Sequence, residues 1–312
     1  LEVIDYLNKE NYYYNAHTAH TKDFQASLFD EMKSRIKEDD SSVPYKYNGY
    51  WYITKYEKGK DYPIYVRKKE TLEAAEELLF DCNEMAKDHS YFRLVGLNIN
   101  LNNDLVSYGI DTTGRRQYTL HIKDLKTNTV FKDEISNTTG GSTWANDNKT
   151  LFYTLKDETT LRSEAIYKHQ LDTDQKSDVL IYKETDDTFG VSVYKNKSRK
   201  YLVIASYSTL TTEYQILNAN TPDGDFKVFQ SRTRGLEYGI SHYEDSFYIV
   251  SNAEGAQNFK LSRTSETQTE KEHWKDVIPH RETVLLEDIE IFKDFLVVSE
   301  RENGLNKIHI KR

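Results

Sequence analysis

The stretch LVSYGIDTTGRRQYTLHIKDL, from Leu105 to Leu125, decides the fold that we predict for this chain. Apolar and polar residues alternate on both sides of the polar loop Asp111–Gly114. Alternation on either side of a Gly/Asp/Thr cluster is typical of two half-buried strands that form a hairpin. Two adjacent arginines, Arg115 and Arg116, stand where the loop meets the second strand. The hairpin predicts the architecture, and the arginine pair is the first candidate for function.

The same hairpin pattern occurs six times along the chain. The first strands start 46 to 55 residues apart, and a partner strand follows each start after 11 to 14 residues. The predicted first strands are Tyr50–Tyr56, Leu105–Asp111, Leu151–Asp157, Tyr201–Tyr207, Phe247–Ala253 and Phe295–Arg301. Most units also show a strand before the hairpin and another after it. Four strands in each of several even repeats predict an all-β fold, a β-propeller of four-stranded blades. A long β-sandwich is the alternative, but it would not keep so even a period.

The residues before Pro44 follow a different period. Phe24, Leu28, Met32 and Ile36 recur every four residues, with charged residues on the other faces, which indicates an amphipathic helix. We therefore expect a helical arm over residues 1–43 and a propeller over residues 44–312. The propeller is expected to be incomplete, because the sixth unit stops directly after its third strand.

Composition excludes several classes of function. The 312 residues carry a net charge of −9 and no basic patch, so nucleic acid is not an expected partner. The single cysteine, Cys82, rules out an internal disulfide and a Cys-based metal site, and we expect it to be a small buried hydrophobe. No apolar run approaches the roughly 20 residues that cross a membrane. No cofactor is expected.

No complete catalytic set is present in the sequence. It contains no G-x-S-x-G, no H-E-x-x-H and no phosphate-binding glycine loop.

Arg115 and Arg116 allow two interpretations. They can pair with surface carboxylates and contribute little stability. Alternatively, they can present planar guanidinium groups to a partner domain or an anionic ligand.

Eight motifs, in order along essentially the whole chain, resemble the amino-terminal part of the oligopeptidase B (protease II) group within the prolyl oligopeptidase family of serine peptidases. The motifs are Asp39–Tyr45 (DDSSVPY), Asn48–Tyr52 (NGYWY), Tyr62–Lys68 (YPIYVRK), Gly114–Tyr118 (GRRQY), Trp144–Asp147 (WAND), Lys183–Phe189 (KETDDTF), Ser251–Phe259 (SNAEGAQNF) and Ile278–Glu282 (IPHRE). The sixfold repeat is visible in the residues alone, and it agrees with this resemblance.

The resemblance implies a seven-bladed propeller that caps an α/β-hydrolase domain carrying Ser, Asp and His. Such an enzyme cleaves short peptides after Lys or Arg, and the propeller keeps folded proteins out. The hydrolase domain is not in this chain, so no catalytic residue can be assigned and the chain alone should be inert. The resemblance further implies that Arg115 and Arg116 are interdomain contacts near the active-site mouth. The helical arm would pack on the hydrolase domain through Phe24, Leu28, Met32 and Ile36.

Two other functions remain open at this point. A stand-alone propeller that binds protein partners would need a complete ring and a self-sufficient arm. A propeller glycosidase would need carboxylates that converge on the central tunnel. We expect a cytoplasmic location, while the periplasm stays open because the true amino terminus is not shown.

Overall fold

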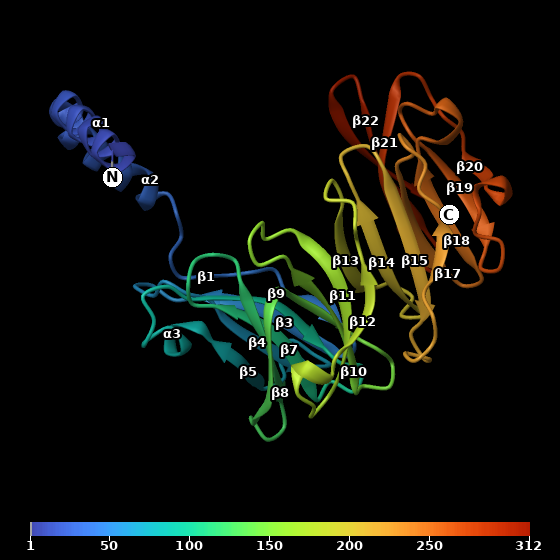
Figure 1. Ribbon diagram of the computed structural model, residues 1–312, viewed down its shortest axis with the longest axis horizontal. Helices are drawn as coiled ribbons and strands as arrows, with labels where there is room; N and C mark the ends of the chain where they lie inside the picture. Colours follow the sequence, from blue (N-terminus) through green and yellow to red (C-terminus); the bar gives the residue numbers. More distant parts are fainter. Residues whose placement is uncertain (1) are drawn as a thin grey trace. The chain divides into compact units, whose positions relative to one another are not determined.

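The computed structural model describes residues 2–312 and divides into two compact units, with the division between Lys87 and Asp88. The boundary predicted between residues 43 and 44 falls inside the first unit and remains a prediction. Helices begin the first unit, and antiparallel sheets make up the rest of both units, which confirms the predicted propeller of blades behind a helical arm (Figure 1). None of the described helices is long and apolar enough to span a membrane.

The arm consists of two α-helices joined by one turn of 3₁₀ helix. Their bounds are Glu2–Thr18 for α1, Ala19–Thr21 for η1 and Lys22–Ser34 for α2. Arg35 caps the carboxyl end of α2, so Ile36, the last residue of the predicted apolar stripe, lies after the helix and not on it. Neither α1 nor α2 buries a residue. The arm thus forms its backbone hydrogen bonds without forming a core.

A five-stranded sheet completes the first unit. Its strands are β1 (Asp40–Ser41), β2 (Tyr45–Tyr47), β3 (Tyr50–Tyr56), β4 (Ile64–Lys69) and β5 (Glu76–Asp81), followed by the short helix α3 (Cys82–Met85). Both β1 and β2 pair with β3. Pro44 lies between them and cannot donate a backbone hydrogen bond, so one outer strand is interrupted into two. Cys82 is buried as predicted.

The second unit contains four sheets. The first is seven-stranded: β6 (Arg93–Ile99), β7 (Leu105–Asp111), β8 (Tyr118–Asp124), β9 (Val130–Trp144), β10 (Thr150–Lys156), β11 (Ser163–Gln170) and β12 (Val179–Lys183). The second is β13 (Gly190–Lys195), β14 (Tyr201–Tyr207), β15 (Thr212–Asn218) and β16 (Lys227–Gln230). The third is β17 (Tyr238–Tyr243), β18 (Ser246–Ser251), β19 (Lys260–Ser265) and β20 (Lys275–Ile278). The fourth is β21 (Val284–Ile291), β22 (Leu296–Glu302) and β23 (Leu305–Lys311). Three 3₁₀ turns, η2 (Gln175–Ser177), η3 (Ala253–Gly255) and η4 (Lys271–His273), lie in the links.

Three clusters of the hydrophobic core lie between successive sheets of the second unit. Phe152 of β10 packs with Leu202 and Ile204 of β14 in one cluster, and Phe229 of β16 packs with Phe247 of β18 in the next. A third cluster joins β19 and β20 to β21 and β22. Because the sheet β13–β16 packs against the sheet before it in one cluster and against the sheet after it in the next, its strand β14 carries apolar residues on both faces.

Strand β9 belongs to two blades at once. Its first half pairs with β8 and its second half with β10, and Thr138 has a partner on both sides. Gly140 allows this change of partner, since its φ of +87° is open to glycine and not to most residues. A Cβ atom at Gly140 would approach Val95 Cγ2 at 2.5 Å and Tyr118 Cγ at 2.8 Å. The second and third blades therefore form one continuous seven-stranded sheet.

All six predicted hairpins are confirmed. Three predicted first strands match β3, β7 and β14 residue for residue, and the other three differ only at their ends. The turn residues Asn48, Asn103 and Asn148 have positive φ angles, as the turn chemistry predicted. The last sheet has three strands, which agrees with the expectation for the sixth unit.

Candidate functional site

The loop that carries the arginine pair is organised by the buried carboxylate of Asp111, at the end of β7. Asp111 Oδ1 accepts hydrogen bonds from the Thr113 amide and hydroxyl, both at 2.8 Å, and from the Gly114 amide at 3.2 Å. Oδ2 accepts from the Arg116 amide at 2.7 Å. Burial alone would raise the pKa of Asp111, but these hydrogen bonds outweigh it and lower the pKa. The loop is therefore held by an ionised side chain.

Arg116 adopts a backbone conformation that is costly for its residue type. Its φ of +58° lies in the left-handed region, which a non-glycine residue occupies only when its surroundings enforce it. Lys156 of β10 adds to that enforcement, because its ammonium group donates to the Arg116 carbonyl. Burial and the nearby Arg116 charge lower the pKa of Lys156. The loop therefore keeps one conformation despite the backbone strain at Arg116 and the repulsion between the Lys156 and Arg116 charges.

The guanidinium groups of Arg115 and Arg116 are exposed, and within residues 2–312 neither one makes an ion pair or a hydrogen bond. The corresponding loop of the next blade provides a contrast. Asp157 caps that loop in the same way, through the amides of Thr159 and Thr160. Its arginine, Arg162, turns back to the Phe189 carbonyl at 2.9 Å and to Glu164 at 3.3 Å. The arginine pair is presented to the outside rather than used to join the blades.

The predicted packing residues of the arm are exposed as well. Phe24 is 68% exposed, Leu28 40%, Met32 54% and Ile36 67%. These side chains form an apolar surface that no described part of the chain covers.

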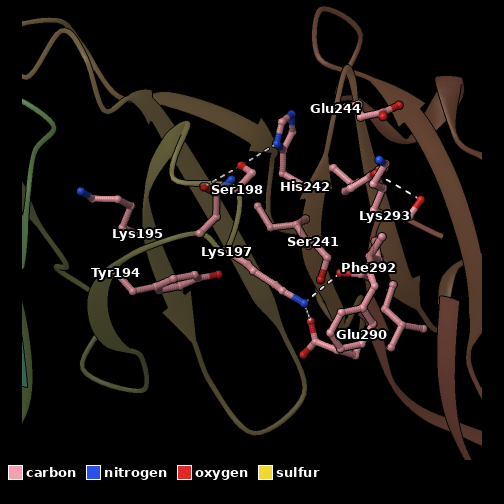
Figure 2. A pocket seen from close by; sticks show the side chains of 15 residues that line it. Tyr194, Lys195, Lys197, Ser198, Ser241, His242, Glu244, Glu290, Phe292 and Lys293 are labelled. Carbon is pink, nitrogen blue, oxygen red and sulfur yellow. Dashed lines mark hydrogen bonds and ion pairs between the residues drawn. The ribbon is translucent and has the colours of Figure 1, made fainter. Parts of the chain in front are cut away.

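A second region, which the sequence did not indicate, is a cavity of about 580 Å³ on β13, β17 and β21 (Figure 2). Lys197 crosses it from the turn after β13 and contacts Glu290 and the Ile291 carbonyl of β21, with its ammonium 4.0 Å from the centre of the Phe292 ring. Tyr194, His242 and Glu290, which line the cavity, stand 48 residues apart in the sequence. This spacing in the sequence could have indicated the cavity, because equivalent positions of successive repeats meet at one surface.

His242 ties the wall of this cavity together. Its Nδ1 lies 2.7 Å from the Ser198 hydroxyl and its Nε2 lies 2.6 Å from Glu266 Oε1, which Lys200 also contacts. Burial lowers the pKa of His242, although Glu266 opposes that effect. The Ser198 hydroxyl also lies 3.0 Å from Asn196 Oδ1, inside its own turn. The cluster therefore fixes the turn between β13 and β14 against β17.

These features describe a β-propeller of four-stranded blades behind a helical arm, with an arginine loop and an inner cavity as its candidate sites. The profile of the prolyl oligopeptidase N-terminal β-propeller domain matches residues 1–312. The chain therefore belongs to the prolyl oligopeptidase family of serine peptidases, and it represents the propeller part of that family.

Individual relatives agree with this assignment. The chain is 36% identical to dipeptidyl aminopeptidase BI of Pseudoxanthomonas mexicana, over 99% of the chain and 45% of the relative. It is 30% identical to protease 2 of Moraxella lacunata, with the same coverage. It aligns with oligopeptidase B from Leishmania major at a TM-score of 0.90 and 32% identity, over 99% of the chain and 44% of that structure. The chain thus spans less than half the length of these relatives.

Proposed function

We propose that this chain is the amino-terminal arm and propeller of a serine peptidase that cleaves short peptides after Lys or Arg. In this proposal a hydrolase domain performs the chemistry, with Ser as the nucleophile and His as the general base. The propeller controls which substrates reach that domain. The observation that carries the proposal is the family match over residues 1–312, which leaves more than half of each relative's length for another domain.

In this proposal Arg115 and Arg116 contact the hydrolase domain near the mouth of the active site. Three features support the assignment: the loop is capped by Asp111, it is braced by Lys156, and its guanidinium groups are unpaired within residues 2–312. A loop whose backbone is already held in one shape loses little backbone entropy when its arginines bind a carboxylate in bidentate fashion.

The arm has a matching role. An exposed apolar stripe on a helix is stable in water only at a cost, and burying one such side chain contributes about 1.5–3 kcal/mol. We assign Phe24, Leu28, Met32 and Ile36 to packing on the hydrolase domain.

The name of one relative favours a second candidate. The protein from Pseudoxanthomonas mexicana is a dipeptidyl aminopeptidase, so removal of dipeptides from free amino ends is the alternative to internal cleavage after Lys or Arg. Peptides with a free or an acetylated amino terminus separate the two. Internal cleavage tolerates acetylation, whereas dipeptide removal does not.

The test compares the protein made from the complete coding sequence with residues 1–312 alone. The complete protein should hydrolyse peptides with Lys or Arg before the scissile bond and react with a serine-directed probe, while residues 1–312 should do neither. The proposal is wrong if the complete protein has no serine-dependent activity, or if residues 1–312 are active by themselves.

Replacing both arginines tests their role in the same complete protein. Arg115→Ala with Arg116→Ala should lower kcat/KM at least tenfold and leave the thermal stability of residues 1–312 unchanged, because neither side chain has a partner among the described residues, 2–312. Lys126→Ala is the control, since it removes a charge from the turn between β8 and β9, at the other end of the same blade. Equal activity in the double variant and the control would refute the interdomain role.

A further inference from the structure

The cavity beside Lys197 continues into a second cavity along the same three strands. This second cavity has a volume of about 520 Å³ and shares Tyr194, Ile240, Ser241 and Ile289 with the first. We call the two together the inner groove. Strands β13, β17 and β21 are each the terminal strand of their sheet. One edge of each strand therefore has no neighbouring strand within the described residues, and such an edge suits an extended peptide.

One end of the inner groove is acidic. The carboxylates of Glu237, Glu287 and Asp288 line it, and no Lys, Arg or His of the described chain does. Glu287 is neutralised by Arg301 at 2.5 Å. Among the described residues, the Glu237 carboxylate accepts a hydrogen bond from the Asn252 side chain alone, at 3.3 Å. The Asp288 carboxylate likewise accepts one from the neighbouring Ile289 amide alone, at 2.7 Å. Two carboxylates in this cavity therefore lack a cationic partner among residues 2–312.

Four aromatic side chains also line the acidic end, among aliphatic and small polar residues. Tyr194, Tyr214, Tyr238 and Phe259 line it, and Figure 2 shows the Tyr194 ring directed into the adjoining cavity. Burial raises the pKa of Tyr194 and of Tyr214, so both hydroxyls remain protonated and can donate hydrogen bonds. Aromatic faces beside carboxylates attract a guanidinium or ammonium group in two ways, through the ring quadrupole and through ion pairing.

The opposite end of the inner groove has a different charge pattern. Lys197 and Glu290 neutralise each other there, whereas Lys293 has no ion pair with the described residues. Lys195 and Glu244 also line this end, so it carries more lysines than carboxylates, in contrast to the acidic end. The six residues of β17 span about 20 Å at the usual rise of a strand, which suits roughly six residues of extended peptide.

We propose that the inner groove binds an extended basic peptide and seats one Arg or Lys side chain between Glu237 and Asp288. This proposal rests on the proposed peptidase function for its biological meaning, because it makes the propeller select basic substrates before cleavage. Its physical basis is separate: two carboxylates without a cation, four aromatic side chains and a terminal strand face one elongated cavity.

The test measures binding by residues 1–312, which requires no catalytic domain. A fluorescent six-residue peptide with one Arg is compared by anisotropy with the same peptide carrying citrulline, which has the shape of Arg without its charge. Wild-type protein should bind the Arg peptide at least tenfold more tightly. Glu237→Gln with Asp288→Asn should lose that preference and bind the two peptides equally.

A matched control uses Glu158→Gln with Asp187→Asn, which removes the same charge from exposed loops that do not line the inner groove. This control should keep the preference for Arg. The proposal is overturned if wild-type protein binds neither peptide, if it binds both equally, or if Glu237→Gln with Asp288→Asn retains the preference. Failure here leaves peptidase activity of the complete protein intact, and absence of that activity leaves this binding measurable, so the two proposals fail separately.

Discussion

His169 of β11 is completely buried between two carboxylates. Its Nδ1 lies 2.6 Å from Asp178 Oδ1, and its Nε2 lies 3.1 Å from Asp133 Oδ2. The Tyr153 hydroxyl donates to the other oxygen of Asp178 at 2.8 Å. Burial by itself lowers the pKa of His169, but the hydrogen bonds and charges of Asp178 and Asp133 outweigh it and raise the pKa above the ordinary value. When His169 is protonated, its imidazolium joins β11 to Asp133 of β9 and to Asp178 through an ionic network.

His169→Gln should destabilise residues 1–312 most at mildly acidic pH. Replacing the cation leaves two buried carboxylates without it, which typically costs about 3–5 kcal/mol. Because the folded-state pKa is raised, the contribution of His169 is complete below the unfolded pKa of about 6.5 and is lost as pH rises through the folded value. Urea unfolding at several pH values should show the gap between wild type and variant narrowing as pH increases.

His121 of β8 is the matched control, because burial lowers its pKa. Because the folded state disfavours the protonated form of His121, this residue destabilises the wild-type protein more as pH falls. His121→Gln removes that effect, so the variant should gain stability relative to wild type at lower pH. If the stability difference from wild type changed with pH in the same direction for both variants, the conclusion that the pKa of His169 is raised would be wrong.

At the scale of elements, β9 depends on one glycine. Gly140→Ala should lower the free energy of unfolding by about 1–3 kcal/mol, the usual cost of overpacking. The added methyl group would meet Val95 and Tyr118, and the positive φ angle adds backbone strain. The urea midpoint of residues 1–312 measures this effect.

The neighbouring residue provides the comparison. A Cβ atom at Gly141 meets nothing within 4 Å, and Gly141 has no positive φ angle. Gly141→Ala should therefore be close to neutral. If both variants lost the same stability, the close packing at Gly140 would not be the cause.

The sequence predicted the hairpins well, because alternation and turn residues are local signals. It missed the continuity of β9, since Thr139, Gly140 and Gly141 look like a break between Val130–Ile135 and the next hairpin. Only the close approach of β6 and β9 shows that this glycine continues the strand. It also missed β1 and β2, whose pairing with β3 depends on tertiary contacts around Pro44.

At the scale of the whole molecule, the arm tests whether the chain requires a further domain. Leu28→Ser with Met32→Ser should leave the melting temperature of residues 1–312 unchanged, because α2 buries no residue in the described chain. If α2 packs on the hydrolase domain as proposed, the same variant of the complete protein should melt several degrees lower, because it loses that apolar packing.

Phe29→Ser is the control for that experiment. Phe29 is 62% exposed and lies beside the stripe rather than on it. The packing role is wrong if Phe29→Ser and the stripe variant have the same effect on the complete protein.

The two candidate sites differ in how far sequence could predict them. The arginine loop is contiguous, so its residues and its junction with β8 could be located directly. The inner groove takes Glu237 and Asp288 from different repeats, and Tyr194 from a third. No local pattern connects such residues, and only superposition of the repeats would have brought them together.

The shared strand β9 has a consequence for how peptides could pass between blades. A gap between two sheets opens only if they can separate, and β9 joins the second and third blades because it pairs with β8 along one part of its length and with β10 along another. We therefore expect the second and third blades to move together as one rigid body. Transient openings in the second unit therefore belong at the seams from β12 onward, where neighbouring sheets are held by side-chain packing, ion pairs such as Arg232–Glu184 and isolated hydrogen bonds rather than by a shared strand. Hydrogen exchange should find those seams more labile than the ladder of β9.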